Sequence, residues 1–275
     1  MTAGRPAWEW RRRGELDVLG WPALDDLGID ALVTTRHGGV SDGPYGSLNL
    51  GLHVGDRPDR VLENRVRAAG AVGASLDDLV VGAQVHGDQA AVVTSQDRGR
   101  GARGTDDAVP DTDALVTTEA GVVLVTLVAD CVPVVLVDPG AGVLATVHAG
   151  WRGTAARIVE ATLAAMTRLG ARPADVWAGI GPTVAPGRYQ VGPEVADALG
   201  RAMGDLGTAA VLAADGPGHW RADLVGANRR QLERAGVPSA QVEGPPCATG
   251  QPGPFFSDRE ARPCGRFALL AVRRP

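Results

Sequence analysis

The chain has 275 residues, of which 44% are hydrophobic but only 4% aromatic, so aliphatic side chains must fill a core of substantial size. The formal net charge is −5 at pH 7 and no long basic run occurs, which argues against nucleic acid as a partner. The 38 Gly and 19 Pro residues are dispersed among apolar runs, which indicates many tight turns and argues against a disordered chain.

In chain order, short runs of Val, Leu and Ala between turn residues predict strands. The expected strands cover residues 31–35, 79–84, 90–94, 114–117, 122–128, 132–137, 143–148, 175–180 and 266–272. Residues 122–137 form the longest apolar stretch, which is typical of strands that are buried on both faces.

Helical periodicity occurs in four segments, at residues 58–69, 154–169, 193–203 and 222–235. Asp56 is expected to cap the first of these helices, with Pro58 in its first turn. Helices and strands are interspersed and no linker divides the chain. The interspersed elements indicate an α/β or α+β protein, of which we expect α/β, with a single domain over residues 1–275.

Several features bear on where the protein works. A cluster of arginines at residues 11–13 is flanked by glutamates and followed by no apolar segment, so we expect a solvated terminus and no export signal. The apolar stretch at 122–137 is interrupted by Asp130 and Pro133 and is too short to span a bilayer. Widely separated cysteines argue against a disulfide framework. The expectation is a cytoplasmic protein without a membrane partner.

Two histidines and one cysteine stand at predicted strand ends, where α/β proteins gather functional side chains. His86 follows one strand, Cys131 lies between two apolar strands, and His148 ends another. A thiolate and two imidazoles suit tetrahedral Zn²⁺, and three protein ligands leave a fourth position open, as in catalytic zinc sites. The spacings of 45 and 17 residues match no compact ligand pattern. From the residues alone, a structural cysteine and two loop histidines remain the commoner explanation.

Motifs over nearly the whole chain resemble those of the YfiH/YlmD family, also called laccase-domain proteins or peptidoglycan editing factors. The matching segments are Thr-Thr-Arg-His-Gly-Gly-Val-Ser at 34–41, Pro-Tyr-Gly-Ser-Leu-Asn-Leu-Gly at 44–51, Gln-Val-His-Gly at 84–87, Asp-Ala-Leu-Val-Thr at 113–117, Ala-Asp-Cys-Val-Pro at 129–133, His-Ala-Gly-Trp-Arg-Gly at 148–153 and Phe-Phe-Ser-Asp-Arg at 255–259. The resemblance implies that His86, Cys131 and His148 are zinc ligands and catalytic residues. It also implies a single-domain four-layer α/β/β/α sandwich with mixed sheets.

The family has been described as polyphenol oxidases, as purine nucleoside phosphorylases with adenosine deaminase activity, and as editors of peptidoglycan precursors. We expect a zinc-dependent purine nucleoside enzyme that phosphorolyses adenosine, inosine, guanosine or methylthioadenosine and deaminates adenosine. Its partners are then a nucleoside and phosphate, its cofactor is Zn²⁺ with copper as the alternative, and a monomer is expected.

Four further residues are expected at the site. Arg36 precedes two glycines, and a fixed cation beside flexible backbone amides is suited to phosphate, so Arg36 is expected to be catalytic and substrate-binding. His37 adjoins it, and Asn49 and Arg259 lie in the family's motifs, so these three are expected to bind substrate.

Asp130, next to Cys131, is either a partner of a ligating imidazole or a buried hydrogen-bonded carboxylate. His53 is expected to be an ordinary loop residue.

Three other functions remain open. Cys131 could be a nucleophile with His148 as base, hydrolysing amide bonds of cell-wall precursors. Polyphenol oxidation by a true multicopper laccase is disfavoured, because the five histidines include no His-x-His pair. A non-enzymatic structural zinc protein would need a fourth ligand, which Cys247 could supply.

The sequence also departs from the family pattern. Gln190 stands in place of a common Glu, Asp258 in place of a Tyr or another large residue, and Cys264 in place of Thr. None of these changes removes an expected zinc ligand. Because of these departures, the resemblance does not define which substrate the cavity prefers.

Overall fold

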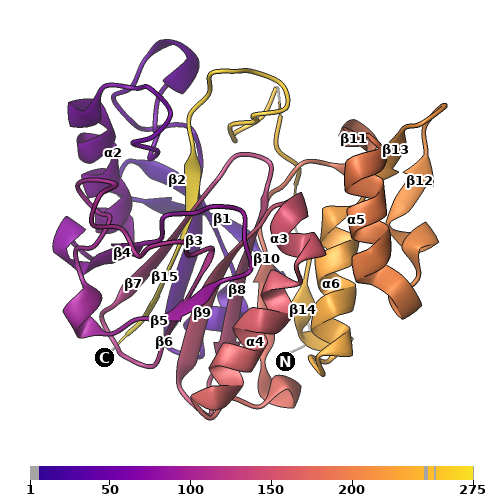
Figure 1. Ribbon diagram of the computed structural model, residues 1–275. Helices are drawn as coiled ribbons and strands as arrows, with labels where there is room; N and C mark the ends of the chain where they lie inside the picture. The colour runs from indigo at the N-terminus through magenta and orange to yellow at the C-terminus, as the bar shows by residue number, and fades with distance from the viewer. Residues whose placement is uncertain (1–5, 245–246, 251, 275) are drawn as a thin grey trace.

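The computed structural model describes residues 6–244, 247–250 and 252–274 (Figure 1). The strands are β1 (Glu9–Arg13), β2 (Leu16–Gly20), β3 (Ile29–Thr34), β4 (Leu79–Val81), β5 (Ala90–Val92), β6 (Ala114–Thr117), β7 (Val123–Val128), β8 (Val132–Asp138), β9 (Val143–Ala149), β10 (Trp177–Ile180), β11 (Gln190–Val191), β12 (Leu212–Ala214), β13 (Trp220–Ala222), β14 (Val242–Glu243) and β15 (Phe267–Arg273). The helices are α1 (Pro22–Asp25), α2 (Pro58–Ala71), α3 (Trp151–Ala155), α4 (Ile158–Arg168), α5 (Pro193–Met203) and α6 (Leu224–Arg234).

The first large sheet has the strand order β1-β2-β3-β15-β7-β4. Its neighbours are antiparallel except β7 and β4, which are parallel. The late strand β15 lies between β3 and β7, with Leu269 opposite both Val33 and Thr126. The sheet therefore joins the two ends of the described chain.

The second large sheet has the order β14-β10-β8-β9-β6-β5 and is parallel only at its two edge pairs. Its central hairpin, β8 and β9, pairs Pro133 with His148 and Val132 with Ala149. Because of this register, Cys131 just before β8 lies beside the end of β9. Two of the three candidate ligands are thus brought together by one antiparallel pair.

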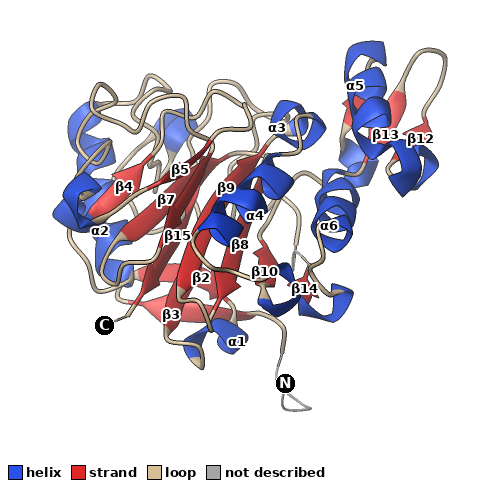
Figure 2. Cartoon of the chain, turned by 60° about the horizontal axis from the view of Figure 1, so that its bottom comes forward, coloured by secondary structure: helices blue, strands red, loops and turns tan. Residues whose placement is uncertain are grey.

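The two sheets pack face to face, and helices cover their outer faces (Figure 2). Alternate residues of β8 show this arrangement: Val135 and Val137 belong to the core between the sheets, whereas Val134 and Leu136 face α4 and α6. On the other side, α2 packs Ala68 on the outer face of the first sheet. Since both faces are buried, the strands are apolar throughout. The expected mixed α/β/β/α layering is confirmed.

A small three-stranded sheet, β11-β13-β12, lies with α5 at one side of the layered body (Figure 2). Helix α5 also contacts α3, which begins directly after β9. None of the helices among the described residues combines the length and apolar character needed to cross a bilayer.

Several local expectations need correction. The helix expected over 154–169 is two helices, α3 and α4, because Arg157 adopts a left-handed conformation with φ of 66° between them. Arg57, not Asp56, precedes α2, and the Asp56 carboxylate instead binds Ser41 and Asn49.

The arginine cluster at 11–13 is not a free terminus, because it belongs to β1. Its first side chain, Arg11, is mostly buried and donates to both carboxylate oxygens of Asp25. This bidentate ion pair attaches β1 to α1, and neither the composition nor the local sequence indicates it.

Candidate metal centre and its cavity

Three side chains converge at one end of the facing sheets. His86 lies in the loop after β4, Cys131 in the crossing from β7 to β8, and His148 near the end of β9. One possible ligand atom from each residue lies within 4.8 Å of the others. His86 is exposed, Cys131 partly exposed and His148 buried, so the group of three, hereafter the donor group, is reachable from solvent.

Asp113 orients both histidines of the donor group. One of its carboxylate oxygens lies 2.8 Å from Nδ1 of His148. The two oxygens also accept backbone N–H groups from Val85, His86 and Gly87 at 3.1, 3.0 and 2.8 Å. These bonds stabilise the turn in which His86 has a positive φ of 62°. With Nδ1 of His148 engaged, Nε2 is the nitrogen left for another partner.

The helix start after His148 is shaped to leave room for the donor group. A methyl group added at Gly150 would lie 3.0 Å from Sγ of Cys131 and 3.0 Å from Cδ2 of His86. Glycine therefore serves steric clearance at this position, since its φ of −70° is open to any residue and any larger residue would push on two members of the donor group.

The chemistry of the donor group fits a borderline-soft divalent ion. One sulfur and two imidazole nitrogens match tetrahedral zinc sites, in which donors at 2.0–2.3 Å from the ion lie roughly 3.5 Å apart. A spread within 4.8 Å is near that requirement. A carboxylate on the second nitrogen of a ligating histidine is the usual arrangement around such ions, and Asp113 provides it for His148. The group can therefore hold a metal ion.

Without an ion, Cys131 and His148 form a coupled charged pair. Burial alone would raise the pKa of the Cys131 thiol, but the charge of His148 and hydrogen bonds from both imidazoles lower it to about 6. Burial opposes protonation of His148, yet the Cys131 thiolate and Asp113 raise its pKa to about 9. The pKa of Asp113 is lowered, because the His148 bond and the backbone N–H groups outweigh its burial. The same residues could thus act as a thiolate nucleophile and its partner.

A cavity of about 810 Å³, hereafter the metal cavity, opens onto the donor group. Its polar lining includes five arginines, and aromatic and apolar walls come from Trp151, Tyr189 and Leu224. Apolar walls with a few polar groups are typical of small-molecule sites. His53, which lies in a loop as expected, also lines it.

The other expected site residues divide between the cavity and elsewhere. Arg259 lines the metal cavity. Arg36 lines a separate small pocket, where its guanidinium lies 4.6 Å from the ring centre of Phe256 and donates to the Gly46 carbonyl. His37 beside it is exposed and is not among the residues that line the metal cavity.

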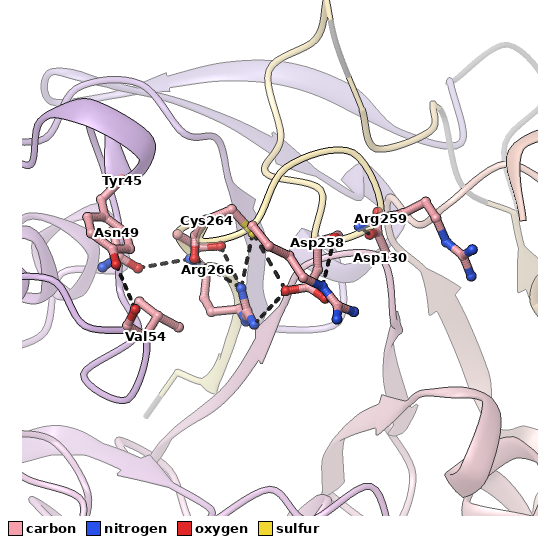
Figure 3. Close-up of polar contacts among 10 residues, drawn as sticks. Tyr45, Asn49, Val54, Asp130, Asp258, Arg259, Cys264 and Arg266 are labelled. Carbon is pink, nitrogen blue, oxygen red and sulfur yellow. Dashed lines mark hydrogen bonds and ion pairs between the residues drawn. The ribbon is translucent and has the colours of Figure 1, made fainter.

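Asn49 is fully buried and does not line the metal cavity. Its Oδ1 accepts the backbone N–H of Arg266 at 2.9 Å (Figure 3). The same oxygen accepts the N–H of Gly51 at 2.9 Å, and Nδ2 donates to Asp56 at 2.9 Å. Both ends of the amide are therefore engaged in joining loops.

Two open assignments near Cys131 are resolved. Asp130 is a buried hydrogen-bonded carboxylate, because its oxygens accept the Thr249 hydroxyl and the backbone N–H of Arg259 (Figure 3). Cys247 is partly buried against the hydrophobic core and does not belong to the donor group found among the described residues. A closed site with Cys247 as a fourth ligand finds no support in this arrangement.

Some cavity residues were not singled out from the sequence. Tyr189, Arg262 and Leu224 line the cavity from segments distant in the chain. Arg262 could not be recognised from the sequence, because arginine is common on protein surfaces and only the fold shows that it lies beside Asp258. Tyr189 could have been found by its position in a Pro- and Gly-rich segment shortly before α5.

Comparison with known proteins shows the family of the chain. Residues 30–274 match the family model described as multi-copper polyphenol oxidoreductase laccase. The chain is 41% identical to the purine nucleoside phosphorylase YlmD of Geobacillus stearothermophilus over 94% of this chain and 96% of that protein. It is 41% identical to the adenosine deaminase RL5 of an unknown prokaryotic organism, over 89% and 93%.

Among solved structures, the crystal structure of YlmD from Geobacillus stearothermophilus superposes with a TM-score of 0.92 at 39% identity. The match covers 97% of this chain and 99% of that one. At this coverage the likeness of fold extends over nearly the whole of both chains. The chain belongs to the laccase-domain family that includes YlmD, as its motifs predicted.

Proposed function

We propose that this protein is a zinc-dependent purine nucleoside enzyme that phosphorolyses adenosine, inosine, guanosine or methylthioadenosine and deaminates adenosine. The observation that carries the proposal is the donor group of His86, Cys131 and His148 at an accessible cavity of about 810 Å³. Relatives named purine nucleoside phosphorylase and adenosine deaminase, each 41% identical, support the substrate class. We further propose that the enzyme acts as a cytoplasmic monomer.

In this proposal the donor group binds Zn²⁺, which when bound supplies Lewis acidity at that end of the cavity. Asp113 keeps the His148 ring in the orientation that presents Nε2 to the ion. Tyr189, Trp151 and Leu224 provide the apolar surface against which a purine can pack.

The two reactions make different demands on the cavity. In phosphorolysis a phosphate oxygen forms a bond to C1′ of the ribose as the C1′–N9 bond breaks, and the base leaves with the electron pair and takes up a proton. In deamination water adds to C6 of the adenine and ammonia leaves. Both need the substrate oriented and its developing charge balanced, and the cavity's arginines are suited to the second task.

A second candidate uses the same residues without a metal. Cys131, His148 and Asp113 form a chain in which a thiolate pairs with an imidazole oriented by a carboxylate. Such a chain could hydrolyse amide bonds, as in the editing of peptidoglycan precursors. Metal content distinguishes it from the first candidate.

Polyphenol oxidation by a multicopper centre is not proposed despite the family's description. The whole sequence holds five histidines and no His-x-His pair, which is too few for such a centre. Copper bound by the donor group remains chemically possible, because imidazole and thiolate also bind copper.

The test measures zinc and copper per chain in protein purified without added metal, together with inosine and adenosine turnover in the presence of phosphate. We expect about one zinc per chain. We expect both zinc and turnover to be lost in Cys131→Ala but retained in the matched variant Cys247→Ala. Metal-free protein that hydrolyses an amide substrate would instead establish Cys131 as a nucleophile.

A further inference from the structure

The described lining of the metal cavity carries an excess of positive charge. Five arginines line it, whereas its only carboxylates are Asp130 and Asp258. Asp130 is saturated by the Thr249 hydroxyl and the Arg259 backbone N–H. Asp258 is shared by two arginines of the lining, Arg262 and Arg266. A neutral nucleoside needs no such excess, so the charge points to an anionic second ligand.

Four of the five arginines already have partners. The Arg65 guanidinium is buried and donates to the carbonyls of Leu50, Gly101 and Ala102. Arg262 and Arg266 pair with Asp258, and Arg152 lies 3.7 Å from a Glu194 carboxylate oxygen. The guanidinium groups of these four arginines are therefore already engaged by carbonyl or carboxylate groups of the protein.

Arg259 differs from the other four. Its guanidinium makes no ion pair with any carboxylate in the part of the chain that the structure describes. It lies over the ring of Tyr189, 4.9 Å from the ring centre, and extends away from the group formed by Asp258 and Arg266 (Figure 3). Tyr189 is itself buried, so the ring is a fixed support for the guanidinium plane.

The backbone of Arg259 is fixed relative to the donor group. Its N–H donates to the Asp130 carboxylate at 2.6 Å, and Asp130 immediately precedes Cys131. The backbone carbonyl of Asp130 accepts a hydrogen bond from the Thr183 hydroxyl at 2.5 Å. This bond stabilises Asp130 in its left-handed conformation, with φ of 83°. One residue thus positions the cation and the candidate ligand together.

We propose that Arg259, supported by Tyr189, is the binding site for inorganic phosphate in the metal cavity. The planar guanidinium offers two parallel N–H donors that match a tetrahedral oxyanion, and no carboxylate among the described residues pairs with it. The use of the bound phosphate as the attacking group rests on the proposed nucleoside phosphorolysis. There the phosphate oxygen bonds to C1′ as the C1′–N9 bond breaks, and no oxidant or reductant is needed.

This assignment replaces an expectation from the sequence. Arg36 was expected to hold phosphate, but its guanidinium is packed on Phe256 and bonded to Gly46 at a different pocket. Arg259 is the cation that the fold places on the same cavity as the donor group. The two arginines can therefore be compared directly in one experiment.

The first measurement is phosphate binding to the purified protein by titration calorimetry with inorganic phosphate alone. We expect Arg259→Met to weaken binding roughly tenfold, the lower end for a charged hydrogen bond because this side chain is exposed. Arg259→Lys keeps the charge but not the paired donors, and we expect an intermediate loss. Arg168→Met removes an equal charge from an exposed position at the end of α4, and Arg36→Met tests the rival site.

The second measurement is steady-state phosphorolysis of inosine. We expect Arg259→Met to raise KM for phosphate roughly tenfold while KM for inosine changes by less than about threefold. The proposal is overturned if the wild type does not bind phosphate, or if binding responds to Arg36→Met and not to Arg259→Met. It is also overturned if Arg259→Met raises only the KM for inosine.

The two measurements separate this proposal from the proposed function. If phosphate binds through Arg259 but no nucleoside is turned over, the phosphate site stands and the phosphorolysis assignment fails. If inosine is phosphorolysed while the phosphate KM ignores Arg259, the function stands and this site fails. Circular dichroism of each variant confirms that it is folded.

Discussion

The carboxylate of Asp113 connects the two histidines of the donor group: one oxygen lies 2.8 Å from Nδ1 of His148 and 3.0 Å from the backbone nitrogen of His86. Asp113 thus holds the imidazole ring of His148 directly, and it holds His86 through the backbone of its turn. A change at this one position should therefore disturb two candidate ligands at once.

We expect Asp113→Asn to weaken zinc binding roughly 10- to 100-fold, since partners of this kind typically contribute that much. The amide would also present N–H groups to the backbone donors of residues 85–87, which loosens the turn. Competition with a zinc chelator measures the affinity. Asp138→Asn is the matched control, because Asp138 is equally buried and accepts backbone N–H groups of Ala141 and Arg172 away from the cavity. Equal zinc affinity in both variants would contradict the role of Asp113.

Gly150→Ala tests the steric clearance of the donor group. The added methyl would lie 3.0 Å from Cys131 Sγ and from His86 Cδ2, closer than ordinary van der Waals contact. We expect a loss of zinc affinity of roughly tenfold, because ligand positions matter within about half an ångström. Gly70→Ala, in α2 with open space around it, should instead raise the free energy of unfolding by about 1 kcal/mol and leave zinc binding unchanged.

The pH dependence of thiol alkylation tests the charged pair in metal-free protein. Because the thiolate is the reactive form and the pKa of Cys131 is lowered to about 6, its alkylation rate by iodoacetamide should rise through pH 6 and level off above it. Burial raises the pKa of Cys247 and Cys264, so these two should react only in alkaline solution. Mass spectrometry at each pH locates the label. A Cys131 rate that keeps rising between pH 8 and 9, as for an ordinary thiol, would exclude the pair.

Asn49→Ala should act on stability. Asn49 is fully buried, and the variant leaves the buried N–H of Gly51 and the partly buried N–H of Arg266 without their acceptor. We expect the free energy of unfolding in urea to fall by about 2–4 kcal/mol. The exposed Gln96→Ala should change it by less than about 0.5 kcal/mol. An unfolding midpoint unchanged by Asn49→Ala would refute the structural role.

The sequence predicted the buried strands because β8 and β9 are apolar on both faces, a pattern that local inspection detects. It also indicated His86, Cys131 and His148, since rare residue types at strand ends are conspicuous. The break at Arg157 was not predictable, because the helical periodicity runs through it and only packing selects the left-handed residue.

The position of Arg36 could not be predicted for a different reason. Its guanidinium is fixed by Phe256, which is 220 residues away in the chain, and its backbone N–H donates to the carbonyl of Pro254. Nothing in the local glycine-rich segment indicates that partner. Arg259 reaches the metal cavity for a comparable reason, since its backbone is anchored by Asp130, which is 129 residues away in the chain.

The route of the chain between the two sheets has a thermodynamic consequence. His86 lies on the passage from β4 in the first sheet to β5 in the second, Cys131 on the passage from β7 to β8, and His148 within the second sheet. A bound ion would therefore cross-link the seam at which the sheets meet. At a free-ion concentration a thousandfold above Kd, binding adds about 4 kcal/mol to the free energy of unfolding. Ion affinity and sheet docking are then linked quantities, and a core mutation that shifts one sheet against the other will register as a change in metal affinity.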